Sequence, residues 1–365
     1  MKKGVVAVAL AICIFLSGCG TFVNGEYIYT QPHETDAPPQ ENSSLSAKNY
    51  RQLYSVLEKM VQDGASNGVI LVPDYDQSEV ASDAIAAADE LRKTNPIAAY
   101  AVSDIRAVLG TTGGEPALAI TISYTHDRAE IRQIKEVNDV TEATALIHSA
   151  LNACNVGIVL KINQYQAVDF TQIVEDYATA FPEYVIEQPR VTVNVYPDNG
   201  EVRVVELNFT YRTNRESLKE MQNRVRTMFT SARLYVSVDT TAQDKFSHLY
   251  TFIMERFEFD IATSITPAYS LLLHGVGDQR AFAIVYAAMC TREGLECYFV
   301  SGTRNGVAHY WNIVGIDGKY YHVDLLRSRD GGVFRLYNYE QMSGYVWDYD
   351  AYPACTRPVE QQPEP

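Results

Sequence analysis

The sequence predicts an α+β protein in which two related α+β units precede a third domain, a helix packed on an antiparallel sheet. Three observations support this fold class. Helix-periodic apolar positions alternate with short strand patterns along most of the chain. One order of helices and strands occurs twice in succession. Beyond about residue 240, helical patterns lead into three consecutive strands, the last two joined by the tight turn Asp317-Gly318.

The first unit, residues 47–136, begins with an amphipathic helix. Its apolar positions are Tyr50, Leu53, Val56, Leu57 and Met60. A strand over 68–72 and a helix over 78–93 follow. Two strands, over 101–109 and 116–124, flank a Gly-rich turn, and a charged helix starts at Asp127.

The second unit, residues 137–235, repeats this order. It has a helix over 141–153, a strand over 157–161, a helix ending at Phe181-Pro182, and strands over 190–196 and 201–211. We align Gly68-Val-Ile-Leu with Gly157-Ile-Val-Leu, and Ile122-Ser-Tyr-Thr with Phe209-Thr-Tyr-Arg. Neither unit carries a group of residues that predicts a catalytic or binding site. Spacing, partner binding and support of the third domain therefore remain open roles.

The N-terminus predicts export. Residues 1–18 combine two lysines with an apolar run too short for a spanning helix, which is typical of a signal peptide. The run ends in Leu16-Ser17-Gly18-Cys19 and resembles the lipobox of bacterial lipoproteins. That resemblance implies cleavage before Cys19, lipid on its thiol, and an extracytoplasmic protein anchored to the bacterial cell membrane.

Two flanking segments are too polar to fold. Residues 19–46, with a Pro-rich stretch, predict a disordered tether after the lipidated Cys19, and residues 356–365 predict a disordered tail. The net charge of −15 becomes −17 once residues 1–18, with two lysines and no acids, are removed. So acidic a chain argues against binding nucleic acid or an anionic lipid surface.

Four cysteines remain after Cys13 and Cys19 are set aside: Cys154, Cys290, Cys297 and Cys355. They form no CxxC pair and no zinc-spaced cluster, so neither a metal nor another cofactor is predicted. Disulfides are compatible with an oxidising compartment, with Cys290 and Cys297 as one pairing, and free buried thiols are the alternative.

The third domain, residues 236–355, resembles the transglutaminase-like superfamily, which has a papain-like fold. The family pattern is a Gly-Val-Cys-x-x-Tyr-Ala helix start, then strands with Val-x-Gly, His-x-Trp-Asn and Trp-Tyr-x-x-Asp. The matching residues here are Phe282-Ala283, Val300-Ser301-Gly302, His309-Tyr310-Trp311-Asn312 and Tyr320-Tyr321-His322-Val323-Asp324. The match covers roughly residues 240–330.

The resemblance implies a triad with one member replaced. In the family a Cys at the helix N-terminus is the nucleophile, a His takes its proton and an Asp orients the His. His309 and Asp324 match the last two roles, whereas the nucleophile position falls on Gln279, which cannot form a thiolate. Asp278 is expected to cap this helix.

Three functions remain open. The first is an inactive domain whose groove, at Gln279, His309, Trp311 and Asp324, binds or scaffolds a peptide, protein or cell-wall ligand. The second is an active thiol-dependent peptidase or transglutaminase that uses an unrecognised Cys, although Cys290 lies at the wrong end of the helix. The third is a purely architectural role, in which His309 and Asp324 only stabilise the fold.

Aromatic residues crowd the segment after the last of these strands. They are Tyr337, Tyr339, Tyr345, Trp347, Tyr349 and Tyr352. Such residues form glycan or peptide surfaces in some proteins, and pack a loop onto a sheet in others. Both interpretations remain open.

Overall fold

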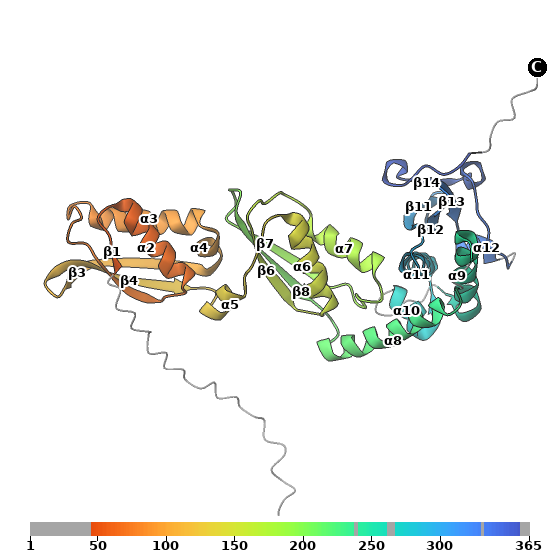
Figure 1. Cartoon of the computed structure of the whole chain (residues 1–365), viewed down its shortest axis with the longest axis horizontal. Coiled ribbons are helices and arrows are strands. Elements are labelled where there is room, and N and C mark those ends of the chain that lie inside the picture. The colour runs from red at the N-terminus through yellow and green to blue at the C-terminus, as the bar shows by residue number, and fades with distance from the viewer. Residues whose placement is uncertain (1–44, 237–239, 261–266, 330–331, 358–365) are drawn as a thin grey trace, which may run out of the picture. The chain divides into compact units, whose positions relative to one another are not determined.

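The first sheet carries its helices on one face. The computed structural model describes residues 45–236, 240–260, 267–329 and 332–357. The first unit comprises β1 (Leu45–Ser46), α2 (Tyr50–Gln62), β2 (Asn67–Leu71), α3 (Val80–Thr94), α4 (Pro96–Ala101), β3 (Val102–Thr112), β4 (Glu115–Tyr124) and α5 (Arg128–Gln133). The sheet order is β1-β2-β4-β3, and α2 and α3 lie side by side on one face (Figure 1). Leu53, Leu57 and Leu91 are fully buried between helices and sheet.

The second sheet has the same strand order and the same pattern of parallel and antiparallel pairs. This unit comprises β5 (Lys135–Val137), α6 (Val140–Asn152), β6 (Gly157–Ile162), α7 (Phe170–Ala180), β7 (Arg190–Tyr196), β8 (Arg203–Thr210) and α8 (Arg215–Arg233). Its order is β5-β6-β8-β7, with β5 and β6 parallel and the other pairs antiparallel. The bounds of β7 and the end of α7 at its C-cap, Phe181, agree with the sequence analysis.

The hydrogen-bond register differs from the sequence alignment by one residue. Leu45 pairs with Ile70 in the first sheet and Lys135 pairs with Leu160 in the second, so Ile70 corresponds to Leu160. Matching Gly68 to Gly157 therefore shifts the strands by one position. Both Ile70 and Leu160 are fully buried under helices. The need to bury these side chains in the core determines the register of a strand more strongly than a shared glycine does.

Two short parallel strands lie at the predicted segment boundaries. β1 falls at the end of the range assigned to the tether, and β5 crosses the boundary placed between residues 136 and 137. Strands of two or three residues give no alternation pattern for the sequence to show. Pro96 begins the short helix α4, capped by Asn95, where the sequence suggested only the end of the preceding helix.

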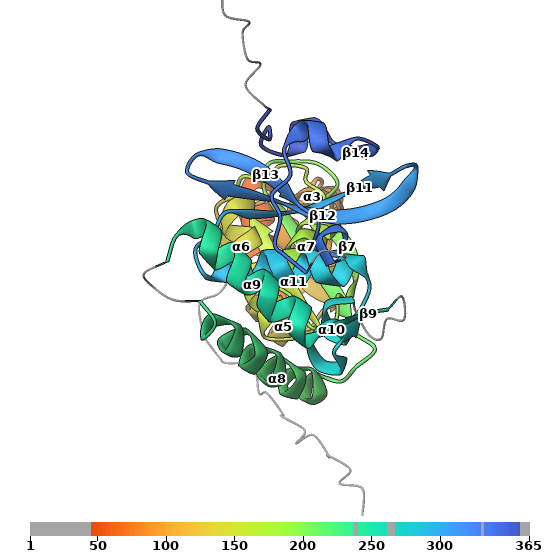
Figure 2. The ribbon, with the colours of Figure 1, turned by 90° about the vertical axis from the view of Figure 1, so that its right-hand side faces the viewer.

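The third domain packs one central helix against an antiparallel sheet. Its elements are α9 (Ala242–Arg256), β9 (Glu258–Phe259), α10 (Pro267–His274), β10 (Val276–Gly277), α11 (Gln279–Arg292), β11 (Cys297–Arg304), β12 (Val307–Ile316), β13 (Lys319–Val323), α12 (Leu325–Arg329), η1 (Tyr339–Met342), β14 (Tyr345–Trp347) and η2 (Tyr349–Ala351). The sheet order is β13-β12-β11-β14. α11 contacts this sheet through β11 and β12 and also contacts α9, and both helices lie below the sheet in Figure 2.

Buried polar and apolar contacts fix α11 on the sheet. The amide of Asn312 in β12 donates to the carbonyls of Ala283 in α11, at 2.9 Å, and Tyr298 in β11, at 3.3 Å. Because Asn312 is fully buried, these bonds are made in a low-dielectric core where they hold the helix in one position. The Asn of the His-x-Trp-Asn motif is therefore the link between helix and sheet.

The aromatic C-terminal segment returns to the sheet. β14 pairs antiparallel with β11, and the backbone of Thr356 bonds to both Tyr320 and Tyr339. This supports the packing interpretation for Tyr337 and Tyr345, which are buried, whereas Tyr349 stays half exposed. Thr356 and Arg357, assigned to the tail, are part of the folded domain, and 358–365 lie outside the described residues.

The second unit and the third domain share one hydrophobic core. Cys154 and Ile186 of the second unit belong to the same buried cluster as Phe229 of α8, Phe246 of α9 and Val285 of α11. The described residues from Leu45 onward form a single compact unit. This common core places the loop after α7 beside α11.

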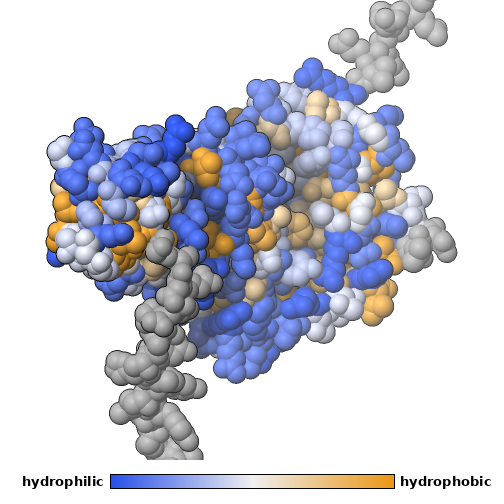
Figure 3. All heavy atoms as spheres, turned by 60° about the vertical axis from the view of Figure 1, so that its left-hand side comes forward, coloured by the Kyte–Doolittle hydropathy of each residue, from blue (hydrophilic) through white to orange (hydrophobic). Residues whose placement is uncertain are grey.

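The first sheet leaves apolar side chains on the face opposite its helices. Val69, Ala119 and Val108 lie in one row across β2, β4 and β3, and Val69 and Val108 are exposed. Apolar surface is visible on this unit in Figure 3.

Within the described ranges, no helix combines the length and apolarity needed to cross a bilayer.

Gly302 is required by close packing, and we predict that Gly302→Ala lowers the free energy of unfolding. Gly302 lies between His309 of β12 and Trp347 of β14, and an added Cβ would meet the Val346 carbonyl and the Trp311 ring. Overpacking of this kind costs about 1–3 kcal/mol. The measurement is the urea midpoint. Gly110→Ala is the matched control, because no atom lies within 4 Å of its added Cβ, and equal losses in both variants would contradict this account.

Candidate functional site

The site lies where β13 ends and α11 begins. β13 pairs with β12 only as far as Asn312, so the β12 edge at His309 has no strand beside it. Asp324 follows the last residue of β13, and Gln279 is the first residue of α11. As expected, Asp278 caps this helix, its carboxylate accepting from the N–H of Ala281 at 2.8 Å. The structure thus brings together three residues that are far apart in the sequence.

Gln279, His309 and Asp324 form a continuous polar chain. His309 Nε2 lies 2.7 Å from Asp324 Oδ2, and since a carboxylate only accepts, Nε2 carries the proton. Gln279 Nε2 lies 2.9 Å from His309 Nδ1 and 2.8 Å from its Nε2. Because Nε2 already donates to Asp324, Nδ1 is the acceptor open to the amide. The amide N–H of Gln279 therefore faces the unprotonated nitrogen of His309.

The carboxylate of Asp324 is fully buried and held charged by its partners. Burial alone would raise its pKa, but hydrogen bonds from His309 and Tyr345 outweigh burial and lower the pKa below 3.8. Tyr345 donates to Oδ2 at 2.7 Å, and the N–H of Arg327 donates to Oδ1 at 3.1 Å. The charge is thus satisfied from three directions, which keeps the His309 ring and its tautomer fixed.

Trp311 supports the site from inside the sheet. Its side chain is fully buried, so it has no surface for a ligand, contrary to its assignment to the groove. Its indole N–H donates to Nδ1 of His322 at 3.1 Å, and its ring lies 5.9 Å from that of His309. Burial lowers the pKa of His322 to about 4, so His322 is neutral at pH 7. The side chain of His309, by contrast, is 12 % exposed.

None of the four cysteines in the described residues lies at the nucleophile position. Their thiols are unpaired, and Cys154, Cys290 and Cys355 are buried. Burial raises the pKa of Cys355 to about 12 and that of Cys154 above 9.0. The pKa of Cys290 is raised well above 9.0, first by burial and then by a hydrogen bond with Cys297. These environments favour the unreactive thiol form.

Sequence reasoning missed Tyr345, Arg327 and His322. Tyr345 lies 21 residues beyond Asp324, and its only sequence signal was membership of the aromatic segment. Arg327 contributes its backbone N–H, for which no residue type is required. His322 was part of a motif but carried no assigned role.

Other predicted sites lie elsewhere or outside the described residues. Cys19, the signal peptide and almost all of the tether fall within 1–44, whose structure is not described. In the described part of the chain, no three His, Cys, Asp or Glu side chains are grouped so that they could hold a metal ion.

We predict that Asp324→Asn destabilises the protein by about 1–3 kcal/mol at pH 7, because a charged hydrogen-bond acceptor is lost. The lowered pKa of Asp324 gives stability that is complete above its unfolded value near 3.8 and is lost as pH falls below it. The difference between wild type and variant should therefore shrink below pH 3.8. Urea midpoints from pH 7 to pH 2.5 measure it.

A second titration provides the internal control. The pKa of His322 is lowered to about 4 from 6.5, so both proteins should lose stability together as pH falls through that interval. A gap between wild type and Asp324→Asn that stays constant down to pH 2.5 would contradict the role given to the carboxylate.

Comparison with known proteins identifies one family for part of the chain. Residues 230–325 match the family model of the transglutaminase-like superfamily. No curated protein matches the chain. Eight solved chains match.

Three of these solved structures are distant in sequence. A TGase structure is 12% identical over 46% of this chain and 50% of its own, with a TM-score of 0.26. A candidate cysteine protease from Cytophaga hutchinsonii is 12% identical over 43% of this chain and 70% of its own, with a TM-score of 0.26. A candidate protease from Parabacteroides distasonis is 10% identical over 70% of this chain and 39% of its own, with a TM-score of 0.23.

Similarity at this level carries no argument about activity. This chain spans half the length of the TGase that it matches. The family match covers the segment that holds Gln279, His309 and Asp324. The chain is therefore a mixed α+β protein that carries a transglutaminase-like domain at residues 230–325.

Proposed function

We propose that this protein binds a peptide or another amide-bearing ligand at the cell envelope without cleaving or cross-linking it. The observation that carries the proposal is the amide of Gln279 beside Nδ1 of an otherwise complete His309–Asp324 pair. A carboxamide both donates and accepts hydrogen bonds, so it can pair with a ligand amide. It forms neither a thiolate nor an acyl intermediate.

The state of the thiols supports binding over catalysis. An active thiol enzyme would need a cysteine beside His309, and Cys290, Cys154 and Cys355 are buried with raised pKa values. Cys297, which is partly exposed, begins β11 and forms a hydrogen bond with the thiol of Cys290. The alternative function, a peptidase or transglutaminase using an unrecognised Cys, has the His309–Asp324 pair in its favour but no cysteine beside that pair among the described residues.

The proposed location follows from the sequence of the N-terminus. Lipid on Cys19 would anchor the protein on the outer side of the bacterial membrane, and residues 20–44 would let the folded domains reach peptides or cell-wall polymers. Proteins or peptidoglycan stems presented at this surface are the ligands that the location favours.

We predict that the full chain binds N-acetyl-alanyl-glutaminyl-alanine amide, with the peptide recovered intact. The sequence has two tryptophans, so the indole N–H region of a nitrogen–proton NMR spectrum holds two signals. The Trp311 signal reports on the site because its ring lies 5.9 Å from the His309 ring. We expect a saturating shift of this signal, and mass spectrometry should find no product.

Variants separate binding from general effects. Gln279→Ala removes one hydrogen-bonding group and should weaken binding by about three- to tenfold. Gln133→Ala, at an exposed glutamine in α5, should leave binding unchanged. Cleaved or cross-linked peptide would establish the enzyme alternative, and no shift with any peptide would favour the architectural role.

We further predict that Gln279→Cys creates a reactive thiol. The new side chain would lie at the N-terminus of α11 beside a base, where thiols form thiolates readily. Iodoacetamide at pH 7, followed by peptide mapping, should label it at least about tenfold faster than a free thiol of pKa about 8.5.

Two further variants test the origin of this reactivity. Adding His309→Ala should remove the acceleration, and Gln133→Cys should react at the ordinary rate of an exposed thiol. If the thiol introduced at position 279 reacts no faster than that control, the His309–Asp324 pair is not arranged for catalysis and the inactive-triad account fails.

A further inference from the structure

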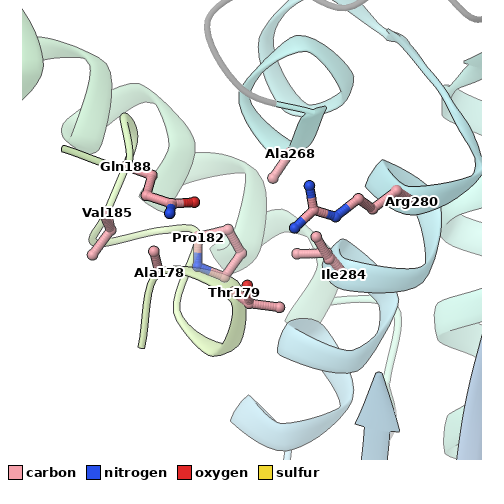
Figure 4. Close-up of a pocket in the computed structure, with 8 residues that line it drawn as sticks. All are labelled: Ala178, Thr179, Pro182, Val185, Gln188, Ala268, Arg280 and Ile284. Atoms are coloured by element: carbon pink, nitrogen blue, oxygen red, sulfur yellow. The ribbon is translucent and has the colours of Figure 1, made fainter. Parts of the chain in front are cut away.

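A small cavity opens beside the N-terminus of α11. It has a volume of about 50 Å³ and lies between the end of α7 and the third domain. Arg280, which directly follows Gln279, lines it together with Ile284 and Ala268 (Figure 4). Since roughly 10–15 Å³ of such volume holds one water molecule, the cavity accommodates a group of a few heavy atoms.

Three hydrogen-bonding side chains converge on this cavity. The guanidinium of Arg280 extends toward the loop that carries Pro182, and the amide of Gln188 points toward the same space from the other side (Figure 4). Thr179 adds a hydroxyl, and the rest of the lining is apolar. A few polar groups set in an apolar lining fix the orientation of a group that enters it.

These groups have unused hydrogen-bonding capacity. Among the described residues, no hydrogen bond or ion pair involves the side chains of Arg280, Thr179 or Gln188. The one contact of the guanidinium is with the Tyr310 ring, whose centroid lies 5.9 Å from Cζ. The nearest acid in sequence, Asp278, already caps α11. A positive charge therefore faces the cavity without a counter-charge, in a protein of net charge −15.

We infer that this cavity is a carboxylate-binding subsite of the ligand groove. A guanidinium presents two parallel N–H donors that match the two oxygens of a carboxylate, and the Thr179 hydroxyl and Gln188 amide can donate as well. The inference rests on the proposed peptide binding and names its ligand class, a peptide with a carboxylate close to the bound amide. Arg280 directly follows Gln279, so the cavity and the proposed amide-binding residue lie at the same end of α11.

The subsite gives the second α+β unit a role. Thr179, Pro182 and Gln188 belong to that unit, whereas Arg280 belongs to the third domain. Ile186, in the same loop, packs into the core that surrounds α11, which holds the two walls of the cavity together. The second unit thus completes the ligand site rather than acting only as a spacer.

Three acetylated peptides and inorganic phosphate test the inference on the full chain. The peptides are N-acetyl-glutaminyl-alanine with a free C-terminus, its fully capped C-terminal amide, and N-acetyl-glutaminyl-glutamate amide, whose only carboxylate is in its side chain. We expect each carboxylate-bearing form to bind about tenfold more tightly than the fully capped form, as expected for one charge-assisted hydrogen bond. The two carboxylate sources are distinguished by which form gains more.

Arg280→Gln should abolish the preference, whereas Arg335→Gln, at an exposed arginine, should retain it. If all forms bind equally and Arg280→Gln has no effect while Gln279→Ala still weakens binding, the subsite is refuted and the proposed function stands. If no peptide binds, both are refuted. Phosphate that competes with the peptides at equal affinity would show a general anion site and overturn the carboxylate assignment.

Discussion

The buried carboxylate of Asp324 is the constraint on which the site depends. A fully buried charge is tolerated only when its oxygens are paired, and here His309, Tyr345 and the Arg327 N–H supply the partners. Each partner comes from a different element. β12, β14 and α12 must therefore all be in place before the carboxylate is satisfied, and the carboxylate in turn fixes where the His309 ring lies.

Under the proposed function, the same arrangement explains how the His309–Asp324 pair persists beside a glutamine. The Asn312 bonds to α11 and β11, the Trp311–His322 pair and the Asp324 network are all part of the core of the third domain. Losing any of them costs stability whether or not a reaction takes place. Position 279, in contrast, lies at a partly exposed helix start, outside these core contacts.

The contact between the second unit and the third domain forms both a shared hydrophobic core and the cavity of the proposed subsite. Ile186 and Cys154 bury themselves among the residues that surround α11, so the two parts share a core. The loop that supplies Ile186 also supplies Pro182 and Gln188 to the cavity beside Arg280. A domain fixed in this way can present polar groups to a ligand with little loss of conformational freedom on binding.

The sequence by itself determined the α+β class, most helices and strands and the cap at Asp278, and it singled out Gln279, His309 and Asp324 as candidate site residues. These follow from local periodicity, from capping chemistry, and from motif spacing within about fifty residues. It could not show the two short parallel strands β1 and β5, the burial of Trp311, or the pairing of β14 with β11. Nor could it place Tyr345 on Asp324 or the loop after α7 beside Arg280. Those contacts join segments with no common period, so only the packing of the folded chain decides them.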